Sequence, residues 1–132
     1  MTRISVVDGA YASFDAAVPA NLLGKEGYAV EQVGGARTVQ LYTGNAPLLG
    51  WLYQKLEGDV AWTVRLAGKG GTVRCVAGGA IAAPPAYVKA SAGGTMVLAN
   101  SADKAHGVKV DPTGVSAAND FIEVHDAFQV VP

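Results

Sequence analysis

Val60-Ala61-Trp62-Thr63-Val64-Arg65-Leu66 is the stretch that decides the fold class, because apolar residues occupy every second position in it. A period of two is that of a β-strand, in which successive side chains point to opposite faces. The face that carries Trp62 and Val64 is expected to pack on a core, and the face that carries Arg65 to lie nearer to solvent. This stretch therefore predicts a half-buried strand.

Similar bursts recur along the chain, and the segments between them are rich in glycine. Gly68-Lys69-Gly70-Gly71 is one such segment, suited to the positive φ angles of tight turns. Helical turns are expected only at residues 21–25 and 101–105. The sequence thus predicts an all-β fold, a compact small β-barrel or β-sandwich of about nine short strands. The expected strands are 28–33, 38–42, 48–56, 60–66, 72–75, 87–90, 95–99, 107–110 and 121–125.

The expected strand 48–56 is apolar on both of its faces. Leu49, Trp51 and Tyr53 fall on one face. Leu48 and Leu52 fall on the other. This pattern is typical of a central strand covered on both sides, and the alternative is that one face docks a partner subunit.

Residues 1–20 form an N-terminal stretch without clear alternation. Tyr11 and Phe14 stand among small residues there, and Pro19 lies near its end. We expect an extended N-terminal arm over residues 1–20, followed by a single β domain over residues 21–132. Because Asp8 and Asp15 interrupt the stretch, we expect no secretory signal peptide. We expect the protein to be synthesised in a cytoplasm.

Composition narrows the classes of partner. The 132 residues are 50% hydrophobic and 16% charged, which favours one folded domain over a disordered chain. The formal net charge of −1 gives no basic surface for a nucleic-acid backbone. The apolar, uncharged stretch 75–88 is shorter than the ~20 residues of a spanning helix, so no membrane partner is expected.

Residues with catalytic or metal-binding chemistry are sparse. Cys75, the single cysteine, falls on an expected inward strand face, where thiols are usually inert. Glu123 and His125 share one strand face, as two metal ligands would, but a third ligand would have to be Asp126 or His106, brought there by tertiary folding. We therefore expect no catalytic residue, no metal, no cofactor and no enzyme activity.

Seven short segments follow one another in a distinctive order and spacing. They are Gly24-Lys25-Glu26-Gly27-Tyr28-Ala29-Val30, Leu49-Gly50-Trp51-Leu52, Val64-Arg65-Leu66-Ala67-Gly68, Thr72-Val73-Arg74-Cys75-Val76-Ala77-Gly78-Gly79-Ala80-Ile81-Ala82-Ala83, Tyr87-Val88-Lys89, Gly107-Val108-Lys109-Val110 and Asn119-Asp120-Phe121-Ile122-Glu123-Val124. This order resembles that of the small capsid cement, or head decoration, proteins of tailed bacteriophages. Two features depart from that family: Pro84-Pro85 stands where a glycine is usual, and residues 1–20 do not align with it.

This resemblance implies a non-catalytic virion protein on the outer capsid surface. Such proteins are commonly homotrimers that bridge neighbouring major capsid proteins and stabilise their lattice. In this chain the apolar excess suggests Trp51 and Tyr53 for contacts within the trimer. Arg3, Tyr11 and Phe14 of the arm are expected to reach a neighbouring subunit.

Two other classes of function stay open at this point. One is a non-catalytic carbohydrate- or ligand-binding β-sandwich module on a virion or cell surface, which an exposed aromatic face would favour. The other is an enzyme, for which Glu123 and His125 are the first residues to replace.

Overall fold

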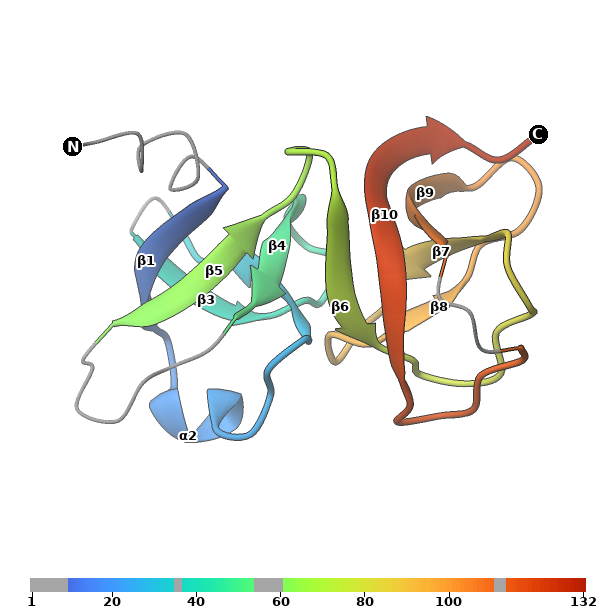
Figure 1. Cartoon of the computed structure of the whole chain (residues 1–132). Coiled ribbons are helices and arrows are strands. Elements are labelled where there is room, and N and C mark those ends of the chain that lie inside the picture. The colour runs from blue at the N-terminus through green and yellow to red at the C-terminus, as the bar shows by residue number, and fades with distance from the viewer. Residues whose placement is uncertain (1–9, 35–36, 54–60, 111–113) are drawn as a thin grey trace, which may run out of the picture.

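The computed structural model describes residues 10–34, 37–53, 61–110 and 114–132, and these residues form ten strands and one short helix (Figure 1). The prediction of an all-β fold is confirmed. The elements are β1 (Tyr11–Ala16), α2 (Pro19–Leu22), β2 (Ala29–Gln32), β3 (Thr38–Leu41), β4 (Leu48–Leu52), β5 (Trp62–Leu66), β6 (Thr72–Val76), β7 (Ala86–Ala90), β8 (Met96–Leu98), β9 (Lys104–Lys109) and β10 (Phe121–Val130).

The first half of the chain closes into a five-stranded barrel in the order β1-β3-β2-β4-β5. Closure depends on β1, which pairs parallel with β3 and antiparallel with β5. Because inward side chains alternate with outward ones, each strand supplies a few residues to the interior. The barrel core consists of Phe14, Leu22, Val30, Val39, Leu52, Trp62 and Val64.

The second half forms a five-stranded antiparallel sheet in the order β6-β10-β9-β7-β8. Its two outer strands approach each other, since Ala77, directly after β6, forms a parallel bridge with Met96 of β8. The Gly78 amide donates to the Met96 carbonyl oxygen at 2.8 Å. The sheet therefore curls towards closure, and its two edge strands shield each other at this end.

Strands β2 and β4 contribute to two cores at once. Val30 and Leu52 point into the barrel, whereas Ala29 and Trp51 point out of it and pack against the second sheet. β4 lies between β2 and β5, so the interpretation of its apolar pattern as a central strand is confirmed over Leu48–Leu52.

The predicted assignment of β4 side chains to faces is wrong at its start. The register with β2 shifts between Val30 and Glu31, which leaves Leu49 as the extra residue of a β-bulge in β4. A bulge adds one residue to one strand and so changes the alternation. As a result Leu48 joins Trp51 in the outer core, and Leu49 packs against the barrel core. Residues 54–56 of the expected strand lie outside the described residues.

The two helical turns expected from the sequence fare differently. The first lies at Pro19–Leu22, where proline suits the first turn of a helix, and so overlaps only the start of the expected range 21–25. Just before it, part of the expected arm forms strand β1 of the barrel. Residues 101–105 form no helix, because β9 begins at Lys104 and pairs with β10. Arg3 and the rest of 1–9 lie outside the described residues. No helix among the described residues is long and apolar enough to cross a membrane.

Candidate functional site: a groove between barrel and sheet

A groove of about 510 Å³ runs between the barrel and the second sheet. Trp51 of β4 lies along it with 1% of its surface exposed, and its indole Nε1 has no hydrogen-bond partner among the described residues. A buried donor without a partner is uncommon in folded proteins. The groove is lined by Tyr11, Glu26, Gly27, Trp51, Leu52, Tyr53, Arg65, Thr72, Val73, Arg74 and Phe121.

Gly27 allows the barrel to approach β6 closely at one end of the groove. Its φ is +89°, a conformation that favours glycine. A Cβ atom there would lie 3.2 Å from the Arg74 carbonyl oxygen and 3.7 Å from the Phe121 ring. The backbone amide of Gly27 donates to the carbonyl oxygen of Leu52 at 2.8 Å. This position therefore brings the two sheets into the contact that shapes the groove.

Aromatic side chains stand on both sides of the groove. The rings of Tyr11 and Tyr53 pack with centroids 4.9 Å apart on the barrel side, and Tyr53 is 51% exposed. On the sheet side the Arg74 guanidinium lies 3.7 Å from the centroid of Phe121, which is 53% exposed. Ring packing and cation–π contact hold these side chains in place.

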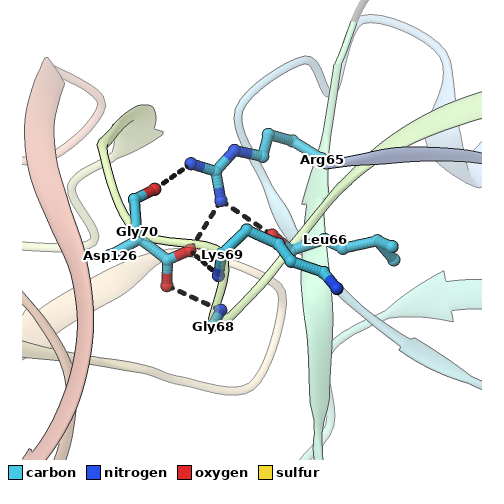
Figure 2. A network of polar contacts seen from close by, with 6 residues as sticks. All are labelled: Arg65, Leu66, Gly68, Lys69, Gly70 and Asp126. Atoms are coloured by element: carbon cyan, nitrogen blue, oxygen red, sulfur yellow. Dashed lines mark hydrogen bonds and ion pairs between the residues drawn. The ribbon is translucent and has the colours of Figure 1, made fainter. Parts of the chain in front are cut away.

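A buried ion pair, Arg65 with Asp126, joins the two halves of the chain at the groove (Figure 2). Arg65 Nη1 donates to Asp126 Oδ2 at 2.6 Å and to the Leu66 carbonyl oxygen at 2.7 Å. Arg65 Nη2 donates to the carbonyl oxygen of Gly70. The guanidinium therefore holds both β10 and the turn between β5 and β6.

Asp126 accepts from the same turn that Arg65 holds. The amides of Gly68 and Lys69 each donate to its carboxylate at 2.9 Å. Gly68 and Gly70 have φ values of +79° and +76°, so the predicted glycine turn is confirmed. The expectation that Arg65 faces solvent is wrong. The second sheet covers this face of β5, and the Asp126 carboxylate of that sheet neutralises the buried guanidinium charge.

The structure separates the five proposed interface residues. Phe14 is 5% exposed within the barrel core, and Trp51 is buried in the outer core, so in the single chain both serve packing. Tyr11 and Tyr53 lie together beside the groove, with Tyr53 open to solvent. Arg3 lies outside the described residues.

The residues considered for metal binding do not converge. Glu123 and His125 are exposed on the outer face of β10, while Asp126 is buried on its other face and bonded to Arg65. His106 lies on β9, where its Nδ1 accepts from the Ala90 amide at 2.8 Å. Burial lowers the pKa of His106, and the positive charge of Lys89 lowers it further. Among the described residues no three His, Cys, Asp or Glu side chains form a group that suits a metal ion.

Glu31, which the sequence pattern does not single out, is a buried carboxylate in β2. Burial favours the neutral form, but the Thr43 hydroxyl and amide, the Gln40 amide and the Gly44 amide all donate to the carboxylate. These donors outweigh burial and lower the pKa of Glu31 to about 2. Glu31 therefore fixes the loop that follows β3.

Acid should weaken the fold through Glu31. The pKa of Glu31 is below its ordinary value of 4.5, so its contribution is complete above pH 4.5 and is lost as the pH falls towards about 2. At neutral pH we expect Glu31→Gln to lower the free energy of unfolding by about 2 kcal/mol. The side-chain NH₂ group of glutamine would face hydrogen-bond donors that now bind the carboxylate. Urea unfolding from neutral pH to pH 2 measures both effects.

Glu123→Gln is the matched control for this prediction, because Glu123 is an exposed carboxylate on β10. It should leave both the stability and its acid dependence close to those of the unmodified chain. An unchanged acid profile in Glu31→Gln would contradict the role assigned to Glu31.

The fold defined above is an all-β architecture of a closed barrel joined to a curled antiparallel sheet. No protein-family model matches the sequence, and a search of curated proteins finds no match either. Among solved structures, the chain is similar to one described as the head fiber gp8.5 N base in bacteriophage phi29. The TM-score is 0.60 with 12% sequence identity, over 92% of this chain and 97% of that chain. At this identity the likeness concerns the fold.

Proposed function

We propose that the chain is a non-catalytic structural protein of a bacteriophage virion, which attaches to the outer capsid surface and stabilises the lattice of major capsid protein. The likeness to the phi29 head fiber base carries the proposal, since it extends over 92% of the chain and so includes both the barrel and the second sheet. The segment order shared with head decoration proteins supports the same assignment.

The described surface suits attachment to a larger assembly. Several large apolar side chains are exposed on it, among them Leu23, Val115 and Phe128. Exposed apolar groups gain free energy when a partner covers them. A protein that binds the assembled lattice more tightly than its separate subunits stabilises the lattice by that difference.

The proposal includes a homotrimer as the attached form. Three copies around a symmetry axis would multiply weak contacts with the lattice, because the second and third contacts form at high effective concentration. Light scattering over a dilution series is expected to give three times the mass of one chain if the trimer forms in solution. If the trimer forms only on the capsid, the free chain is expected to have the mass of one chain.

The test of attachment is sedimentation with heads of the corresponding phage that lack their decoration. We expect the chain to sediment with the heads, to saturate at a fixed ratio to the major capsid protein, and to raise the temperature at which the heads come apart. Heads that already carry the protein are the control and should bind little more. A chain that stays in the supernatant and leaves head stability unchanged would count against the proposal.

A further inference from the structure

The groove between barrel and sheet has a surface suited to a small ring-shaped ligand. Its volume of about 510 Å³ falls within the range of small-molecule sites, ~300–1,000 Å³. Tyr53 and Phe121 present exposed ring surface on its two sides. Flat aromatic faces pack against the C–H face of another ring, and the ring contacts with Tyr11 and Arg74 support both side chains before any ligand arrives.

The charges along the groove favour a neutral ligand. Glu26 and Arg74 are of opposite sign, and the charge of Arg65 is already matched by Asp126. A phosphate-bearing ligand would need an excess of positive charge, which this lining does not have. The Thr72 hydroxyl, the Glu26 carboxylate and the Arg74 guanidinium offer both acceptors and donors to hydroxyl groups.

We propose that this groove is a binding site for an uncharged saccharide, with a pyranose ring packed against Tyr53 and Phe121. Glu26, Thr72 and Arg74 bind its hydroxyl groups. This activity is separate from capsid attachment, so it is tested on the free chain and stands or falls independently of the proposed function.

The experiment is an NMR titration of the full chain with maltose, N-acetylglucosamine and galactose. At least one sugar should move the Trp51 indole resonance and the amides of Gly27, Thr72 and Arg74, with a Kd on the order of 1 mM. Tyr53→Ala and Phe121→Ala should each weaken binding about tenfold, because each removes one stacking face.

Phe128→Ala is the matched control, since Phe128 is an exposed phenylalanine on the same strand as Phe121 and is 56% exposed outside the groove. It should leave the affinity unchanged. Absence of shifts with all three sugars, or equal affinity in Tyr53→Ala and Phe121→Ala, overturns the proposal. Shifts that depend on protein concentration, and not on sugar, would identify the groove as an interface between copies and also overturn it.

Discussion

Replacing Asp126 with alanine is expected to lower the free energy of unfolding by about 3–5 kcal/mol, because it leaves the Arg65 guanidinium buried without its counter-charge. The Arg65 side chain is 11% exposed, and the Asp126 side chain is fully buried. The substitution also removes the acceptor for the Gly68 and Lys69 amides. Urea unfolding at neutral pH measures the loss.

Two further variants distinguish the ion pair from general packing. Asp103→Ala removes the partner of Lys89 in a partly exposed ion pair and should have a much smaller effect, although Asp103 also accepts from the Asn100 amide. Replacing the buried pair by Arg65→Met with Asp126→Leu should recover part of the stability lost in Asp126→Ala. Equal losses in Asp126→Ala and Asp103→Ala would contradict the importance assigned to the buried pair.

Gly50→Ala is the second substitution with a large expected effect. A Cβ atom at this position of β4 would lie 2.1 Å from the Arg65 carbonyl oxygen and 2.9 Å from its carbonyl carbon. Both atoms are backbone of the neighbouring strand, so relief requires β4 and β5 to separate. We expect a loss of about 3–5 kcal/mol or failure to fold, since β4–β5 is one of the strand pairs that make up the closed barrel.

Gly79→Ala provides the comparison within the same chain. A Cβ atom at Gly79 meets no other atom within 4 Å, and Gly79 is not among the glycines with positive φ. This variant should unfold at nearly the same urea concentration as the unmodified chain. If Gly50→Ala were as stable to urea as the unmodified chain, β4 and β5 would tolerate a wider spacing than they have in the structure, and the prediction would be wrong.

The strands could largely be predicted from the sequence, because each of the nine predicted ranges overlaps a strand, although β9 (Lys104–Lys109) begins earlier and β10 (Phe121–Val130) runs further than predicted. β1 could not, since Phe14 is its only side chain that is buried and the segment shows no alternation. Its strand conformation comes from pairing with β5, in which Tyr11 lies opposite Arg65. Such a long-range partner leaves no local pattern.

The groove and its ion pair could not be predicted from the sequence for a related reason. Arg65 occupies the polar phase of an alternating strand, which normally means exposure to solvent. Here a second sheet covers that phase, and the neutralising Asp126 lies 61 residues away. An excess of apolar residues around them indicates Tyr53 and Tyr11 from the sequence. Arg74 and Phe121, which complete the groove, lie on strands that pair only in the folded chain.

Cys75 gives the chain a practical property for chemical labelling. It is the one cysteine in the sequence, its side chain is fully buried, and burial raises the pKa of its thiol. Thiol reagents act on the exposed thiolate, so this cysteine stays unreactive while the fold is intact. A cysteine introduced at Ser101, which is exposed in the turn before β9, would then accept a dye or a displayed peptide at a single defined position on each copy.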